Sequence, residues 1–421
     1  MNNEKIYIFL ICYFLVIIGF SFVIYGFTDV LQGFIKIQIS ASRLISDYFE
    51  IAGIGGTLLN ASILSLLSIL LLLILKVRMG GAVLASVFTI FGFALFGKNI
   101  PSVLSLWFGV FIASKIAGKR FIEYIFIALF GSALSPVFSL ISFETGLNPV
   151  LAIFSGVFFT IIIGSILPSL AIYMLRLHQG YNLYNVGMTA GFLSIFISSI
   201  LRNVNIDLKL LDFWSKNITH IDIILIPLTC ILFIVLGLIY KPRQALKSFF
   251  ELQKESGRLP SDFYTLYGYG AVFINIAALT LIYYIYVILT KSPTNGPVLG
   301  GLFTILGFAA FGKNLRNCLP VLIGVILTAI LLKKPLNSPA IILGALFSTT
   351  LAPLAGSFGI IAGLIAGALH IILVQFTAGW VGGLNLYNNG FAGGLVATFL
   401  VAIIDWLENS SLVKIKSKIK E

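Results

Sequence analysis

Long runs of apolar residues, separated by short polar segments, recur along the whole chain. In the first half they lie at 5–27, 51–75, 81–97, 101–116, 121–142, 147–175 and 182–201. In the second half they lie at 221–240, 266–289, 296–312, 317–332, 339–354, 357–377 and 385–404. Most contain the roughly 20 residues that a helix needs to cross a bilayer. The third and fourth runs of each half (81–116 and 296–332) are shorter. They predict either two cramped helices or one re-entrant hairpin with its tip at Lys98 or Lys313.

Composition supports a membrane protein and excludes a soluble one. The 421 residues are 59% hydrophobic and only 10% charged, whereas soluble proteins contain about a quarter charged residues. The apolar runs are also much longer than the roughly 10-residue strands of outer-membrane barrels. The sequence therefore predicts an all-α membrane protein with up to 14 transmembrane segments, some of them re-entrant. The first run predicts a transmembrane helix and not a cleaved signal peptide, because no small-residue cleavage site follows it.

The sequence contains an internal duplication. Shifting the sequence by 215 residues places Val83–Val110 on Val298–Val325, and 15 of these 28 positions are identical. The same shift pairs Asn60 with Asn275. After a shortening of the second copy, the Asn-Leu-Tyr-Asn motif at 182–185 matches 385–388. We predict one membrane repeat at 1–212 and a second at 213–421, which ends in a basic tail at 409–421.

Helix parity and positive charge predict that the second repeat is inverted. Seven crossings, or five with a hairpin, are both odd numbers, so the second copy enters the membrane from the opposite side. With the N-terminus inside, predicted cytoplasmic loops hold 16 Lys and Arg residues, against 8 on the outside. This excess follows the positive-inside rule and predicts a cytoplasmic N-terminus and C-terminus. The net charge of +12 is thereby explained without nucleic acid as a partner.

The paired Phe-Gly-Lys-Asn motifs at 96–99 and 311–314 are the first candidate site. Short, Gly-interrupted segments at matching positions of inverted repeats are typical of substrate sites in secondary transporters. At such tips Lys98 and Lys313 would approach the midplane, where an unpaired ammonium is costly and an anion is its natural partner. Asn99 and Asn314 would add hydrogen bonds. In the alternative interpretation these lysines only complement helix ends and extend to the lipid headgroups.

The Asn-Leu-Tyr-Asn motifs are the second candidate. Each precedes a Gly-rich helix, and Asn185 and Asn388 are good N-cap residues at a helix end that attracts anions. We include them with Asn182, Tyr184, Asn385 and Tyr387 as candidate substrate-binding residues. The alternative is an ordinary helix cap followed by a Gly-xxx-Gly packing face, which we favour for the glycines. Asn60 and Asn275 are predicted to join helices by hydrogen bonds, and His370 is predicted to have a packing role.

Several chemistries lack the residues that they need. None of the 15 acidic residues lies in the interior of an apolar run, which disfavours proton coupling through a buried carboxylate. Sodium coupling through backbone carbonyls stays open, so Na⁺ is a possible partner besides the substrate and the lipid bilayer. No metal-ligand spacing and no Walker-type loop occur. The sequence therefore predicts no cofactor, no metal and no enzymatic activity.

At these paired motifs the chain resembles an uncharacterised family of duplicated bacterial membrane proteins with a domain of unknown function. The resemblance covers essentially the whole chain. It implies a location in the bacterial cytoplasmic membrane and supplies no activity. Residues 180–182, Gly-Tyr-Asn, are also faintly similar to urea-transporter repeats, but the second copy reads Gly-Leu-Asn and no substrate is transferred from that similarity.

From these observations we predict a secondary transporter of a small solute, with an anion favoured, whose site lies between the two repeats. The alternative is a passive channel or facilitator for a small neutral polar solute, which the lack of buried acids also fits. A membrane-embedded enzyme and a non-transporting scaffold are less favoured alternatives.

Overall fold

The computed structural model describes residues 3–216 and 220–410, and all its elements are helical apart from one isolated bridge between Ser46 and Phe213. The tail lysines at 414–420 lie outside the described residues. The helices of the first repeat are α1 (Asn3–Tyr25), α2 (Phe27–Gln38), α3 (Tyr48–Ile74), α4 (Gly81–Phe93), α5 (Ile100–Ile116), α6 (Ile125–Gly131), α7 (Ser135–Phe143), α8 (Pro149–Leu177) and α9 (Asn185–Asn203).

The second repeat has the same order of helices. They are α10 (His220–Leu238), α11 (Pro242–Leu252), α12 (Phe263–Leu289), α13 (Gly296–Phe308), α14 (Leu315–Leu331), α15 (Pro339–Phe347), α16 (Ala352–Phe358), α17 (Ile360–Trp380) and α18 (Asn388–Glu408). Glycines at equivalent positions, Gly53 in α3 and Gly268 in α12, have positive φ and kink both helices near their starts. The predicted helical duplication is therefore confirmed in detail.

The segments at 81–116 and 296–332 form two pairs of short helices. The 13 residues of α4 and of α13 make a helix about 20 Å long, less than the roughly 30 Å of hydrocarbon in a bilayer. Among the described residues, nine helical stretches are long and apolar enough to cross, and the bent pair α10 and α11 is a tenth candidate. The structure thus favours five crossings and one hairpin per repeat over seven crossings.

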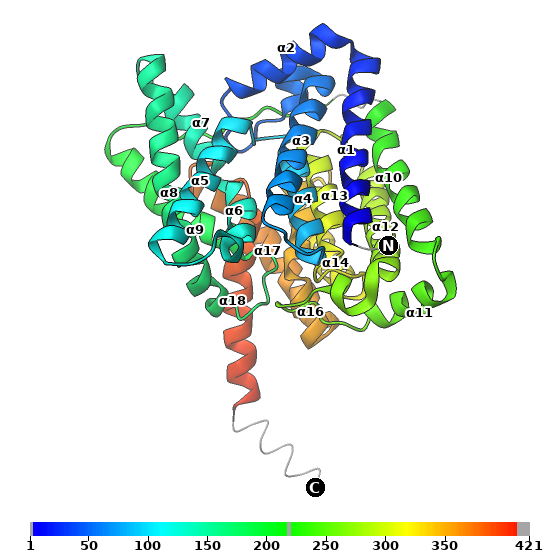
Figure 1. The fold of residues 1–421 in the computed structure, drawn as a ribbon. Coiled ribbons are helices and arrows are strands. Elements are labelled where there is room, and N and C mark those ends of the chain that lie inside the picture. Colours follow the sequence, from blue (N-terminus) through cyan, green and yellow to red (C-terminus); the bar gives the residue numbers. More distant parts are fainter. Residues whose placement is uncertain (1–2, 217–219, 411–421) are drawn as a thin grey trace.

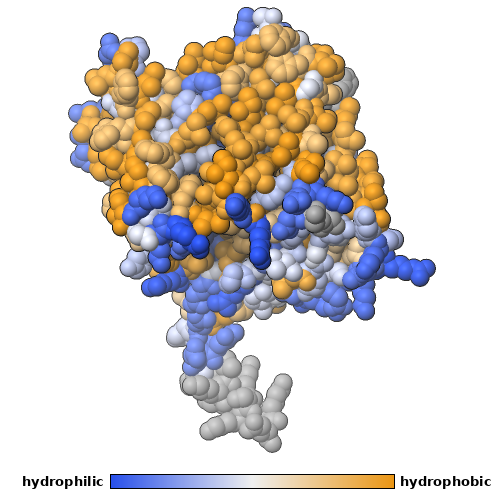
Figure 2. Space-filling model, viewed as in Figure 1, coloured by the Kyte–Doolittle hydropathy of each residue, from blue (hydrophilic) through white to orange (hydrophobic). Residues whose placement is uncertain are grey.

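Two short amphipathic helices that the apolar pattern did not predict show that the repeats are inverted. The equivalent helices α2 and α11 lie at opposite ends of the molecule (Figure 1). We call these ends the α2 side and the α11 side. Hydrophobic side chains cover most of the face seen in Figure 2, and hydrophilic ones gather toward the α11 side. This distribution matches a belt in contact with lipid and a polar end in water.

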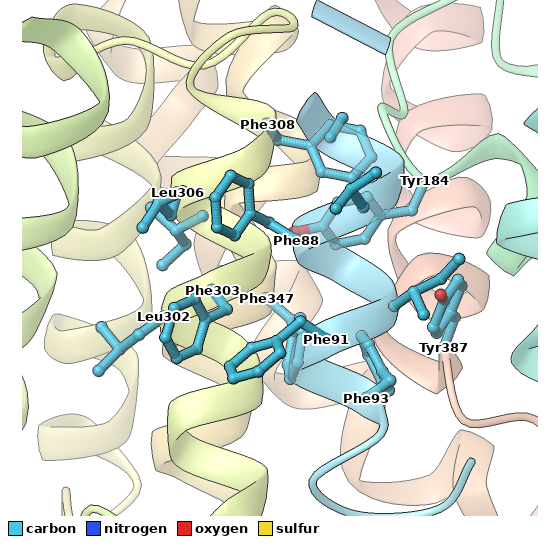
Figure 3. Close-up of a cluster of buried hydrophobic side chains, with 14 of the residues drawn as sticks. Phe88, Phe91, Phe93, Tyr184, Leu302, Phe303, Leu306, Phe308, Phe347 and Tyr387 are labelled. Carbon is cyan, nitrogen blue, oxygen red and sulfur yellow. The ribbon is translucent and has the colours of Figure 1, made fainter. Parts of the chain in front are cut away.

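The first helices of the two hairpins, α4 and α13, pack against each other in the centre of the molecule. They run antiparallel, because the start of α4 at Gly81 touches Ala310 after α13, and the start of α13 touches Leu95 after α4. Phenylalanine rings fill much of their contact, with 4.7 Å between the centroids of Phe91 and Phe303 (Figure 3). The two hairpins therefore enter from opposite sides and overlap along their length.

Polar side chains hold each hairpin in place. Asn60 in α3 donates from Nδ2 to the carbonyls of Ala94 and Lys98, both at 2.9 Å, and Asn275 in α12 does the same for the second tip. These bonds agree with the predicted role of the two asparagines in joining helices. Asp47 accepts from Gly296 N at 3.2 Å, and Asp262 from Gly81 N at 3.0 Å, so each repeat caps the other's hairpin.

Close contact between α4 and α13 predicts sensitivity to a single methyl group. A Cβ on Gly92 would lie 2.7 Å from Gly300 O and 3.0 Å from Gly300 Cα, and this backbone has little freedom to move. We expect Gly92→Ala to lower the free energy of unfolding by about 1–3 kcal/mol, measured by thermal unfolding of the purified protein. Gly19→Ala is the matched control, since nothing lies within 4 Å of its Cβ position. A Gly92→Ala protein as stable as this control would contradict the prediction.

Candidate functional site

Each repeat contains one interrupted helix beside its hairpin. The stretch from 121 to 143 breaks at the 3₁₀ turn Ser132–Leu134 between α6 and α7, and α15 and α16 are separated by Ser348–Leu351. The Asn-Leu-Tyr-Asn loop of the other repeat donates a hydrogen bond at each break. Leu386 N donates to Ala133 O at 2.9 Å, and Leu183 N donates to Thr350 O at 3.0 Å. Both sequence motifs are thereby brought to the interface between the repeats.

The two candidate lysines bind the tyrosines of the opposite repeat. Lys98 Nζ donates to Tyr387 OH at 2.6 Å and to Ser132 Oγ at 2.7 Å. Lys313 Nζ donates to Tyr184 OH. The first hairpin tip is thus joined to the second repeat and the second tip to the first repeat, in a crossed pair of equivalent contacts.

Both ammonium groups are fully buried, and neither forms an ion pair within the described ranges 3–216 and 220–410. Aromatic rings and hydroxyl groups surround them. Lys98 Nζ lies 4.7 Å from the centroid of the Tyr387 ring, and Lys313 Nζ lies 4.5 Å from that of Tyr184. Ring faces attract a cation, but less strongly than a carboxylate does. Neither lysine therefore has a counter-charge in the described residues, and a bound anion would stabilise the charged form of either one.

A cavity of about 510 Å³ lies between the repeats, next to both tyrosines. Equivalent residues of the two repeats line its inner part, and most of them are apolar: Thr89 and Thr304, Phe93 and Phe308, Leu183 and Leu386, Tyr184 and Tyr387, Gly187 and Gly390. Figure 3 shows Phe93, Phe308, Phe347 and the two tyrosines around this region. The cavity continues along Arg176, Gln179 and Pro260 at the α11 side.

The α2 side is closed at the equivalent position. Arg43, which is 3% exposed, pairs with Glu144 at 2.6 Å and donates to Gly382 O at 3.2 Å. Arg258 is the equivalent of Arg43 on the α11 side. It donates to Gln179 O at 2.8 Å, is exposed, and forms no ion pair within the described residues. The α2 side therefore has a buried ion pair at this arginine, and the α11 side has none at the equivalent arginine.

Asn99 and Asn314 lie directly after the lysines and cap the second helix of each hairpin. Asn99 Oδ1 accepts from Ser102 N at 3.2 Å, and Asn314 Oδ1 accepts from Asn317 N at 2.9 Å. Both side chains are fully buried, and neither asparagine lines the cavity. Their amide groups hold the hairpin turn.

The asparagines of the second motif also make structural bonds. Asn182 and Asn385 donate to Gly390 O and Gly187 O of the opposite repeat, both at 3.0 Å. The expected N-caps at Asn185 and Asn388 are wrong, because α9 and α18 begin at these residues and their side chains bond Ala171 O and Val374 O on the preceding helices. The glycines behave as expected, since a Cβ on Gly187 would lie 3.2 Å from Gly390 Cα.

The hydrogen bonds of His178 define which of its ring nitrogens carries the proton. His178 Nδ1 accepts from Asn182 N at 3.2 Å, so Nε2 carries the proton and donates to Asn185 Oδ1 at 2.9 Å. Burial lowers the pKa of His178, which keeps the ring neutral at pH 7. Likewise, His370 is buried and its Nε2 lies 3.0 Å from Asn389 Oδ1, in line with the packing role predicted for it.

Several residues of the site were not singled out from the sequence. Phe93, Phe308 and Thr89 lie inside the repeated block, and their identity in both copies was a usable signal. Ser132 carried no such signal, since it lies in an uninterrupted apolar run. The described ranges contain no group of His, Cys, Asp and Glu residues that could hold a metal ion.

Two inverted helical repeats, joined through crossed hairpin tips, define a multi-pass membrane protein built by internal duplication. The family model described as "Protein of unknown function (DUF1576)" matches residues 27–203 and 241–406, one segment in each repeat, and the chain belongs to this family. The predicted resemblance is thereby confirmed. No curated protein and no solved structure matches the chain.

The two crossed contacts predict unequal effects of removing each tyrosine hydroxyl. Tyr184 OH is the one hydrogen-bond partner of Lys313 Nζ within the described part of the chain, whereas Lys98 keeps Ser132 if Tyr387 is changed. We expect Tyr184→Phe to lower the free energy of unfolding by about 1–3 kcal/mol and Tyr387→Phe by less. Thermal unfolding measures both, with exposed Tyr240→Phe as the control. The reverse order would contradict the assigned partners.

Proposed function

We propose that this protein is a secondary transporter that carries a small anionic solute by alternating access between its two inverted repeats. The observation that carries the proposal is the pair of buried lysines, each at a hairpin tip and each bonded across the repeat interface to a tyrosine that lines the cavity. Interrupted helices at matching positions of inverted repeats are a common way to build a transport site within a membrane.

Electrostatics favours an anion as the solute. Lys98 and Lys313 are fully buried without a carboxylate partner in the described ranges, and no acidic side chain lines the cavity. Removing a charge from water costs several kcal/mol unless another charge compensates it. A bound anion next to Tyr184 or Tyr387 would supply that compensation to the lysine bonded to that tyrosine, and a neutral solute would not.

Closure of one end favours alternating access over a continuous pore. The cavity reaches the α11 side, while Arg43 and Glu144 close the α2 side. Because the repeats are equivalent, exchanging their conformations would open the α2 side and close the α11 side. That exchange requires the Arg43–Glu144 pair to separate. The positive-inside rule favours a cytoplasmic α11 side, and in that orientation this conformation would face inward.

Anion binding that depends on both lysines tests the chemistry. We expect phosphate, acetate or benzoate to raise the melting temperature of the purified protein by mass action, and urea to leave it unchanged. Lys98→Met and Lys313→Met should each abolish the anion shift, because each removes one uncompensated charge. Lys291→Met, at an exposed loop position, is the control and should retain it. Equal shifts in all three variants would rule out the twin-lysine site.

Labelling of a cavity cysteine tests the transport mode. In a protein whose Cys12, Cys230 and Cys318 are replaced by Ala, we expect Thr304→Cys to react with a membrane-impermeant maleimide from the α11 side. Adding Glu144→Gln should increase reaction from the α2 side, because it removes the charge that holds Arg43. Gln179→Cys is the control on the α11 side, and its labelling gives the maximum extent of reaction from that side. Reaction from both sides without Glu144→Gln would favour a channel instead.

A further inference from the structure

We infer that the anion bound between the repeats is a small organic anion with an aromatic body, such as an aromatic carboxylate, and not an inorganic ion. The inference rests on the proposed transport function and specifies the substrate class of the same site. It comes from the walls of the cavity, from its volume and from one hydroxyl group without a partner.

Aromatic rings from both repeats form the inner walls. Phe93 lies 4.3 Å from Tyr387 and 5.3 Å from Phe347, between ring centroids, and Phe308 lies 4.9 Å from Tyr184. All five rings line the cavity. Rings prefer offset or edge-to-face neighbours at centroid distances of about 4.5–7 Å. Another aromatic ring would therefore extend an arrangement that is already present.

The volume of the cavity excludes an inorganic ion as its sole occupant. About 510 Å³ falls within the roughly 300–1,000 Å³ of sites for organic ligands. A phosphate or chloride ion would fill a small part of it and leave water against phenylalanine. Apolar walls bind by removing apolar surface from water, and these ions have no such surface.

Thr89 marks a place for a polar group of the ligand. Its side chain is 2% exposed, it lines the cavity, and its Oγ1 has no hydrogen-bond partner in the described structure. The equivalent Thr304 also lines the cavity, but its Oγ1 donates to Gly300 O at 2.7 Å. A buried hydroxyl without a partner costs about 1–3 kcal/mol. A ligand oxygen at Thr89 would remove that cost.

Calorimetric titration of the purified full-length protein with four probes tests the inference. Benzoate carries both the charge and the ring, acetate only the charge, phosphate a charge without carbon, and benzyl alcohol only the ring. We expect benzoate to bind at least about tenfold more tightly than acetate or phosphate, from burial of the ring. Benzyl alcohol should bind more weakly than benzoate, and Lys98→Met should remove most of that difference.

Two threonine substitutions form a matched pair. Thr89→Val should weaken benzoate binding by about fivefold, through loss of one hydrogen bond, and Thr304→Val should change it less than about twofold, because its hydroxyl is already bonded within α13. Thr89→Ser keeps the hydroxyl and should keep the affinity. This variant preserves the test if Thr89→Val does not fold.

The outcomes separate the substrate class from the transport function. Acetate or phosphate binding as tightly as benzoate, still dependent on Lys98, would overturn the aromatic substrate and leave the anion transporter standing. Cyclohexanecarboxylate binding as tightly as benzoate would overturn the preference for an aromatic ring. Benzyl alcohol equal to benzoate in the wild type and in Lys98→Met would overturn both proposals, as would no binding of any probe.

Discussion

A backbone carbonyl or amide without a partner in the hydrocarbon layer costs several kcal/mol, and this constraint organises the centre of the molecule. Each repeat interrupts one helix and turns one hairpin within the apolar belt, which frees backbone groups. The freed carbonyls at Ala133 and Thr350 accept from loops of the opposite repeat, and those of the hairpin tips accept from Asn60 and Asn275. Because the carbonyls at each helix break are bonded by the opposite repeat, the position of one repeat depends on that of the other.

The candidate site follows from these hydrogen bonds between the two repeats. The loop that closes each helix break also carries the tyrosine that accepts from the opposite lysine. The hydrogen bonds that satisfy the backbone therefore also fix the positions of two buried lysines, and the aromatic residues beside them line a cavity that is mostly apolar. Under the proposed function, the lysines and the apolar walls would act together, since neither alone would distinguish an organic anion from a neutral solute or an inorganic ion.

Much of this architecture could be predicted from one sequence. Identities such as Gly97-Lys98-Asn99 with Gly312-Lys313-Asn314 defined the repeat, and helix parity defined its inversion. The pairing of Lys98 with Tyr387 could not be predicted, because it depends on how the two copies dock. The helix break at Ser132 could not be predicted either. Serine is tolerated inside a membrane helix when its hydroxyl donates to a preceding carbonyl, as Ser65 does in α3, so a serine alone does not indicate a break. Asn99 looked like a ligand because a cap and a site favour the same residue type.

The crossed contacts also say something about how such a chain could arise. Lys98 and Tyr184 belong to one repeat, yet each finds its partner in the other. A single copy of the repeat thus contains both a lysine and a tyrosine of this type, but these two residues do not bond each other within the copy. Two identical copies inserted in opposite orientations would form both contacts around a twofold axis in the membrane plane. Once two such copies are fused, their sequences can diverge, and an ion pair that Arg43 forms with Glu144 and that the equivalent Arg258 lacks requires copies that are no longer identical.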